Sequence, residues 1–179
     1  RADIIIVTKC NNDLTIEVQR KIVKEINPLP HQRVFFTTML YGNPYHLFNP
    51  HQWHLSTTDN VLLVCGIANP KPIKTFLNQH SGYFEVMQYA DHHIFTTANL
   101  EEIITRFNRM TGDKKIILTT EKDAVRLEKF KSELSEYPVY VLPVKHDFLF
   151  GESVVFFKTL KTYIEGFDLN RHQMDTLTK

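Results

Sequence analysis

The chain has 179 residues, 42% of them apolar and 23% charged, and a net charge of +1 at pH 7, which is typical of one globular domain or slightly more. A net charge this close to zero does not indicate the broad basic surface of a nucleic-acid-binding protein, so no nucleic-acid partner is expected. Cys10 and Cys65 are the only cysteines, and their separation argues against a disulfide framework or a zinc ribbon. No apolar run approaches the roughly 20 residues that cross a bilayer.

Short β-rich runs alternate with helical patterns along the chain. Strands are predicted at residues 3–9, 33–39, 60–66, 83–89, 114–120 and 139–144. Most of them are continuous apolar runs, as in strands that are buried on both faces. Helices are predicted at residues 13–26, 70–80, 98–110, 121–131 and 152–165, with Asp13 expected to cap the first. This alternation predicts an α/β fold with a mostly parallel sheet and flanking helices.

Residues 41–58 break this rhythm. They carry two Asn-Pro steps and the only Trp without a helical or strand period, so a hinge or linker loop is predicted there. We therefore expect residues 1–40 to end one α/β domain, residues 59–166 to form a second, and residues 167–179 to be a flexible tail. The chain begins with Arg1 rather than Met, which suggests a piece of a longer protein.

Two strand ends carry candidate binding residues, because ligands of parallel sheets collect at the carboxyl ends of strands. Thr8 and Lys9 close the first predicted strand, and they either flank a nucleotide base or form an ordinary strand-to-helix turn. Asn69 is predicted to cap the next helix, with Pro70 at its first position. That helix N-terminus could also hold an anion, although capping alone accounts for the residues.

A third strand end reads TEKDAVRL, residues 120–127. Thr120 and Asp123 have the spacing of a helix cap, which leaves Glu121, Lys122 and Arg126 unexplained. Together with Asp123, these charges either form a solvated cluster or bind a phosphate or a sugar.

The fourth strand end is the cluster Asp91, His92 and His93. A histidine can take a proton near neutral pH, and a neighbouring carboxylate can fix its tautomer and raise its basicity. Adjacent side chains on an extended backbone point in different directions, so the two histidines are predicted to differ in role.

The strand ends as a set resemble those of a known family. The runs are RADIIIVTK, QRVFFTTMLYG, VLLVCGIANP, ADHHIFT, IILTTEKDAVRL and VYVLPV. In this order and spacing, over residues 1–165, they resemble the C-terminal part of tetraacyldisaccharide 4'-kinase, the lipid A 4'-kinase. GIANP, DHH and TEKDAVRL are specific together, whereas each alone is weak.

The resemblance implies a phosphotransferase. Members of that family transfer the γ-phosphoryl group of ATP to the 4'-hydroxyl of a lipid A disaccharide 1-phosphate precursor, at the cytoplasmic face of the bacterial inner membrane. The resemblance also implies that residues 1–40 end a P-loop-type domain and that residues 59–166 are a Rossmann-like second domain. His92 is then the catalytic residue that deprotonates the sugar hydroxyl with an Asp of the other domain, and Asp91 supports it.

The chain lacks the phosphate loop of that family. A P-loop reads GxxxxGK[ST], and none of the six glycines is followed by Lys-Ser or Lys-Thr. We therefore expect ATP and Mg²⁺ to be held mainly by another part of the full-length enzyme, and no cofactor or metal in this chain. Contact with the inner-membrane surface is expected through a missing N-terminal region. The isolated chain is expected to be a soluble fragment without kinase activity.

Two alternatives remain open. A DHH-type phosphoesterase also places Asp-His-His after an apolar strand, but it needs several more Asp and His ligands for its metals, and no DxD element occurs here. In a non-catalytic sugar- or nucleotide-binding module, every strand-end motif would serve capping and packing alone.

Overall fold

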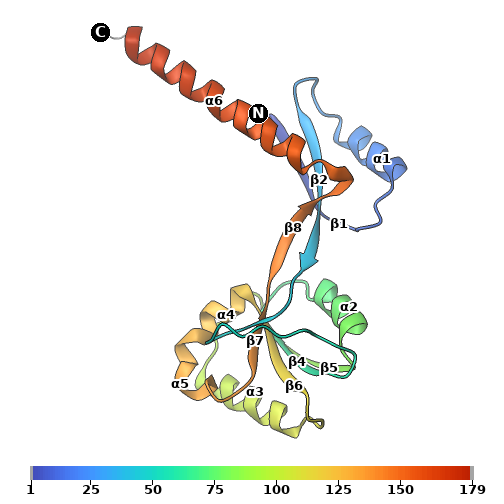
Figure 1. The fold of residues 1–179 in the computed structure, drawn as a ribbon, viewed down its shortest axis with the longest axis vertical. Helices are drawn as coiled ribbons and strands as arrows, with labels where there is room; N and C mark the ends of the chain where they lie inside the picture. Colours follow the sequence, from blue (N-terminus) through green and yellow to red (C-terminus); the bar gives the residue numbers. More distant parts are fainter. Residues whose placement is uncertain (1, 178–179) are drawn as a thin grey trace. The chain divides into compact units, whose positions relative to one another are not determined.

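The computed structural model describes the backbone of residues 2–177 and the side chains as far as residue 166. The chain divides into two compact units, Tyr41–Val144 and Arg1–Leu40 with Lys145–Lys179, so it passes from one unit to the other twice (Figure 1). Each unit has a sheet of its own.

The unit of residues 41–144 is built on a five-stranded sheet with the order β3-β7-β6-β4-β5. Its strands are β3 (Tyr45–His46), β4 (Asn60–Cys65), β5 (Tyr83–Gln88), β6 (Lys115–Thr120) and β7 (Val139–Leu142). β4 pairs in parallel with both β5 and β6, and β6 pairs in parallel with β7. Only the short β3 is antiparallel, at the edge beside β7. The expected mostly parallel sheet of an α/β protein is thus confirmed.

Helices cover both faces of this sheet (Figure 1). They are α2 (Lys71–His80), α3 (Thr97–Arg109), α4 (Glu121–Leu127) and α5 (Lys131–Leu134), with the 3₁₀ turn η1 (Glu128–Phe130) between the last two. Because side chains alternate along β4, Leu62 and Val64 pack with α3, α4 and α5 on one face, whereas Leu63 packs with α2 on the other. Each such side chain, when fully buried, contributes about 1.5–3 kcal/mol.

The other unit has a three-stranded sheet with the order β1-β2-β8. Its strands are β1 (Ile4–Cys10), β2 (Arg33–Tyr41) and β8 (Val144–Phe148), its helices are α1 (Ile16–Ile26) and α6 (Ser153–Leu177), and η2 (Leu149–Gly151) precedes α6. β1 is parallel to β2. The ring of Phe35 on β2 contacts those of Phe148 and Phe156 edge-on, at 6.1 and 5.2 Å between centroids.

Several element boundaries differ from those expected. The first helix begins at Ile16 and is capped by Thr15, whose hydroxyl accepts from the Val18 N–H, so the expected cap at Asp13 is wrong. The strand expected over residues 139–144 is two strands in two different sheets, because Pro143 has no N–H to continue the β7 ladder. The helix expected over 121–131 is divided into α4, η1 and α5.

The two units also have other bounds than the expected domains. Residues 41–58 pack as part of the 41–144 unit, with Trp53 and Leu55 against one core cluster and Phe48 against the other. Residues from 145 on group with residues 1–40, because β8 joins the sheet of β1 and β2. Of the expected tail over 167–179, α6 continues to Leu177, while its side chains and its last two residues lie outside the description.

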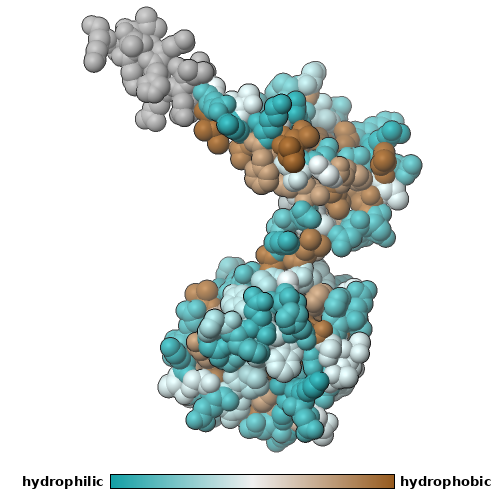
Figure 2. Space-filling model, in the orientation of Figure 1, coloured by the Kyte–Doolittle hydropathy of each residue, from teal (hydrophilic) through white to brown (hydrophobic). Residues whose placement is uncertain are grey.

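Exposed apolar side chains gather on the unit that contains β1, β2 and α6. On the face seen in Figure 2, brown surface is concentrated over this unit, and the 41–144 unit is mostly teal and white. The large apolar side chains exposed in the former unit are Ile6, Ile16, Val18, Leu29, Phe150, Val154, Val155, Phe157, Tyr163 and Ile164. Among the described residues, no helix combines the length and the hydropathy that crossing a bilayer requires.

Candidate active site

Three candidate turns lie at the carboxyl edge of the five-stranded sheet. Gly66 follows β4, Asp91 to His93 follow β5, and Thr120 to Asp123 span the end of β6 and the start of α4. Since β5, β4 and β6 are adjacent and parallel, all three turns are at the same edge, as the sequence predicted. The strand order reverses between β4 and β6, because β5 is added on one side of β4 and β6 and β7 on the other.

The turn with Asp91 and His92 projects into solvent. His92 has a positive φ of 61°, a backbone conformation uncommon for a residue with a side chain, and 74% of its side chain is exposed. Oδ1 of Asp91 accepts from the His92 backbone N–H at 3.0 Å and from Nζ of Lys122 at 2.5 Å. Oδ2 of Asp91 lies 3.8 Å from Nε2 of His92. The hydrogen bond from Lys122 is the main cause that lowers the pKa of Asp91 below its ordinary 3.8, so the carboxylate beside His92 is ionised at neutral pH.

His93 packs against neighbouring side chains and holds the turn in place. Its ring stacks on Tyr89 at 4.6 Å between centroids, and Nε2 lies 2.9 Å from Oδ1 of Asn99. Asn99 also accepts from the Thr96 N–H in a capping box that begins α3. The two histidines therefore differ in environment, and the difference in their roles stays a prediction.

Asp123 is a fully buried carboxylate at the point where the strand order reverses. Its exposed fraction is 0%. Oδ2 accepts from the Gly66 N–H and from the Thr120 hydroxyl, both at 2.8 Å. The Asp123 N–H donates to the Thr120 hydroxyl oxygen at 3.2 Å, which confirms the predicted cap of α4. A carboxylate enclosed in this way has no open face for a ligand.

Arg126 connects Asp123 to the Asp91–His92 turn. Its Nη1 lies 3.2 Å from Oδ1 of Asp123, and its Nη2 lies 3.5 Å from Nδ1 of His92. Lys122 and Arg126 thus contact the turn from one face of α4, and both remain partly exposed. Two of the three charges that the sequence left unexplained, Lys122 and Arg126, are thus part of an ordered ion-pair network with Asp91 and Asp123.

The other expected binding residues are not part of this network. Oε2 of Glu121 accepts from the Val144 N–H at 3.2 Å, and Oδ1 of Asn69 accepts from the Lys71 N–H at 3.1 Å. The helix α2 begins at Lys71 with Pro70 as its N-cap, so the expected cap at Asn69 is wrong by one residue. Thr8 and Lys9 are exposed on β1, in the other unit. Lys9 has a positive φ of 59° at an irregularity in the pairing of β1 with β2.

Metal ligands are sparse in the described part of the chain. Among these residues, no group of three or more His, Cys, Asp or Glu side chains is placed to hold a metal ion. Asp91, the carboxylate beside His92, is already paired with Lys122. The residues around His92 therefore do not fit a Mg²⁺ ion, and they offer no ligand cluster for the two-metal phosphoesterase alternative.

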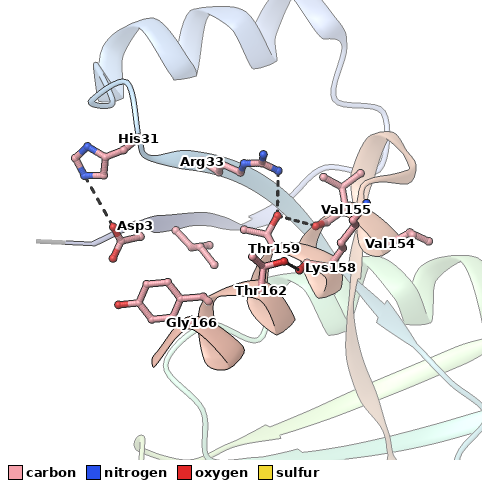
Figure 3. Close-up of a pocket in the computed structure, with 11 residues that line it drawn as sticks. Asp3, His31, Arg33, Val154, Val155, Lys158, Thr159, Thr162 and Gly166 are labelled. Atoms are coloured by element: carbon pink, nitrogen blue, oxygen red, sulfur yellow. Dashed lines mark hydrogen bonds and ion pairs between the residues drawn. The ribbon is translucent and has the colours of Figure 1, made fainter. Parts of the chain in front are cut away.

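Two open grooves lie away from the Asp91–His92 turn. One of about 840 Å³ runs between the β1–β2 side and α6; Figure 3 shows Asp3, His31 and Arg33 on one wall and Lys158, Thr159 and Thr162 on the other. It contains none of the candidate residues. The other, of about 550 Å³, follows β5 and α3 and includes Tyr89, the ring that supports His93.

Two contacts in the site were not predicted from the sequence. Asn99 holds His93 and caps α3 at once, and the spacing from Thr96 to Asn99 is a capping signal that could have revealed it. Gly66 lies directly against the turn: a Cβ there would be 3.1 Å from the Ala90 carbonyl oxygen and 3.3 Å from Cβ of His93. No local pattern predicts that contact, because it depends on the pairing of β4 with β5.

Known proteins resemble this chain over most of its length. The family model of the tetraacyldisaccharide-1-P 4'-kinases matches residues 1–165. The tetraacyldisaccharide 4'-kinase of Phocaeicola vulgatus is 34% identical over 170 residues, which cover 92% of this chain and 46% of that protein. The enzyme of Bacteroides thetaiotaomicron is 32% identical over 178 residues, which cover 92% and 47%. The chain therefore spans about half the length of the curated relatives it matches.

One solved structure also matches. It is the crystal structure of LpxK from Aquifex aeolicus in complex with ATP, with 14% identity and a TM-score of 0.46, and the match covers 84% of this chain and 49% of that one.

Proposed function

We propose, because the chain belongs to the tetraacyldisaccharide-1-P 4'-kinase family, that it supplies the proton-accepting residue of a kinase. The complete enzyme transfers the γ-phosphoryl group of ATP to the 4'-hydroxyl of a lipid A disaccharide 1-phosphate precursor. His92 is the base that accepts the proton of that hydroxyl, and Asp91 stabilises the charge that His92 gains.

The observation that carries this proposal is the exposure of His92 beside an ionised carboxylate. The imidazole is 74% exposed, and Asp91, whose pKa is lowered, lies 3.8 Å from its Nε2. In phosphoryl transfer most of the catalysis is positioning and charge stabilisation, so the acceptor side needs only one group to take one proton. His92 has the chemistry and the access for that role, whereas His93 is held by Asn99 and Tyr89.

In the same proposal, the two units have different fold types. The 41–144 unit is Rossmann-like, since its strand order reverses between β4 and β6 and ligands of such sheets collect at that point. Residues 1–40, joined by residues 145–165, belong to the C-terminal portion of a P-loop-type domain. The hinge lies at the two crossings near residues 40 and 145 rather than over residues 41–58.

The partners follow from the family and from the charges. ATP and Mg²⁺ are held mainly by parts of the complete enzyme outside this chain, in keeping with the poor fit of the His92 surroundings to Mg²⁺. Lys122 and Arg126, together with Thr8, Lys9, Asn69 and Glu121, are the candidates for contacts with substrate or nucleotide. The enzyme acts peripherally on the cytoplasmic side of the inner membrane, where its lipid substrate is.

The test is steady-state kinetics of variants in the protein expressed from its complete reading frame. His92→Ala should lower kcat by about 10²- to 10⁴-fold, the usual contribution of positioned proton transfer, with little change in the KM for ATP. Asp91→Asn should cost less than this, because the base remains but the carboxylate charge beside it is lost.

His93→Ala is the matched control, because it removes an imidazole one residue away and should cost much less than His92→Ala. Circular dichroism checks that all three variants fold. A His92→Ala enzyme with near wild-type kcat would reject the proposal, and a larger loss for His93→Ala would move the base to the neighbouring residue.

A further inference from the structure

Asp123 is connected to the Asp91–His92 turn in two ways. The first runs through the backbone: Asp123 accepts from the Gly66 N–H, and Gly66 lies directly against Ala90 and His93 at the base of the turn. The second runs through Arg126, which bridges Oδ1 of Asp123 and Nδ1 of His92. A displacement of Asp123 would therefore move both the support of the turn and the ring it presents.

We infer that Asp123 is a positioning residue for His92 rather than a ligand-binding residue, an inference that rests on the proposed function. The carboxylate is 0% exposed, so it touches no substrate. It links the carboxyl ends of β4 and β6 through Gly66 and Thr120, and so fixes the edge from which the turn projects.

The contact with Arg126 determines which ring nitrogen of His92 carries the proton. A guanidinium can only donate, so its contact with Nδ1 is favourable only when Nδ1 carries a lone pair. The proton of the neutral ring is then on Nε2, which faces Oδ2 of Asp91 at 3.8 Å. Nδ1 is therefore the nitrogen that accepts the substrate proton, and Asp91 balances the charge of the resulting imidazolium on its other side. The contact from Arg126 is long, at 3.5 Å, so a substrate hydroxyl can replace it.

The first test is a double-mutant cycle in the protein expressed from its complete reading frame, with ATP and tetraacyldisaccharide 1-phosphate as substrates. Asp123→Asn keeps the shape of the side chain but replaces one of its acceptor oxygens by an NH₂ group, which faces hydrogen-bond donors. It should lower kcat by roughly 10- to 100-fold with the KM for ATP unchanged. In a His92→Ala background the same change should cost less than about twofold, because a residue that acts only through His92 has nothing left to position.

Asp59→Asn is the matched control. Asp59 is also buried, at 2%, and accepts from Nε1 of Trp53 and the Ser56 N–H, but it precedes β4 and so lies at the opposite edge of the sheet. Asp59→Asn should lower stability, because it removes a buried charged acceptor of two hydrogen bonds, and it should leave kcat unchanged. An equal loss of kcat from both aspartates, or an equal loss from Asp123→Asn in both backgrounds, would overturn the inference.

Arg126→Met keeps the test decisive if Asp123→Asn does not fold. It leaves the contacts of Asp123 with Gly66 and Thr120 in place and should lose kcat only while His92 is present. A loss that persists in His92→Ala would mean that Arg126 acts through the substrate contact for which it is also a candidate, and not through His92. Nitrogen-15 NMR of the imidazole is independent of activity. Nδ1 of neutral His92 should be the unprotonated nitrogen in the wild type, and the two tautomers should mix in Arg126→Met. A wild-type ring with its proton on Nδ1 would contradict the inference.

If His92→Ala itself keeps full activity, the proposed function fails, and not this inference alone.

Discussion

The Asp91 carboxylate depends on Lys122 for its low pKa, and this gives a prediction that needs no activity. Because the hydrogen bond from Lys122 lowers that pKa, the stabilisation from the pair is present above the ordinary value of 3.8 and is lost as the pH falls through the lowered pKa. Lys122→Met should raise the pKa of Asp91 toward 3.8, as followed by the carbon-13 shift of its carboxyl group. Lys129→Met, which removes an exposed charge that packs over Phe130, should leave the titration unchanged. If both variants titrate like the wild type, the 2.5 Å contact does not persist in solution.

For individual residues, the sequence predicted local relations better than long-range contacts. The sequence predicted that His92 and His93 differ, but it assumed an extended backbone, whereas Asp91 and His92 form a turn. It could not tell which ring faces solvent, because this follows from the positive φ at His92. The spacing of Thr120 and Asp123 predicted the cap of α4. It could not predict the Gly66 N–H as a second partner, because that contact spans 57 positions and depends on the pairing of β4 with β6.

The start of α3 is the element most directly connected to the turn. Oδ1 of Asn99 accepts from the Thr96 N–H and also lies 2.9 Å from Nε2 of His93, so one side chain caps the helix and holds the anchor of the turn. Asn99→Ala should therefore lower the free energy of unfolding by about 0.5–2 kcal/mol, measured by urea denaturation.

Asn78→Ala is the matched control for that measurement. Asn78 is exposed within α2, where alanine is the better helix former, so this variant should be neutral or slightly stabilising. Equal stabilities of the two variants would mean that the capping box at Thr96 does not contribute.

Among the secondary-structure elements, the buried parallel strands were predictable from the sequence, whereas the strands at the sheet edges were not. β4 and β6 are almost fully buried, so their continuous apolar runs stand out in the sequence. β8 reads VKHDF and is mostly exposed, so it has neither an apolar run nor a clear alternation. β3 has only two residues and owes its place to pairing with β7, which no local pattern encodes.

At the scale of the whole molecule, the division into units follows from where the apolar side chains pack. Both large core clusters, one on each face of the five-stranded sheet, consist of residues between positions 41 and 144. The sequence predicted two domains but assigned residues 145–166 to the second, because a strand and a helix that follow a parallel sheet in the chain look like its continuation. β8 pairs with β2, which is far away in the sequence, and the local sequence pattern does not predict such a pairing.

The 41–144 unit should therefore fold without the rest of the chain. It is continuous in sequence and contains both of its core clusters, so its unfolding should be a single cooperative transition. Trp53 is the only tryptophan and packs against one of these clusters, so its fluorescence follows this unit alone, while far-UV circular dichroism follows both units. The urea midpoint of Trp53 should agree between the segment 41–144 and the whole chain. Leu77→Ala, which empties a fully buried position in α2, should lower the stability that Trp53 reports by about 2–5 kcal/mol in both. A segment that shows no cooperative Trp53 transition would mean that the 41–144 unit needs residues of the other unit in order to fold.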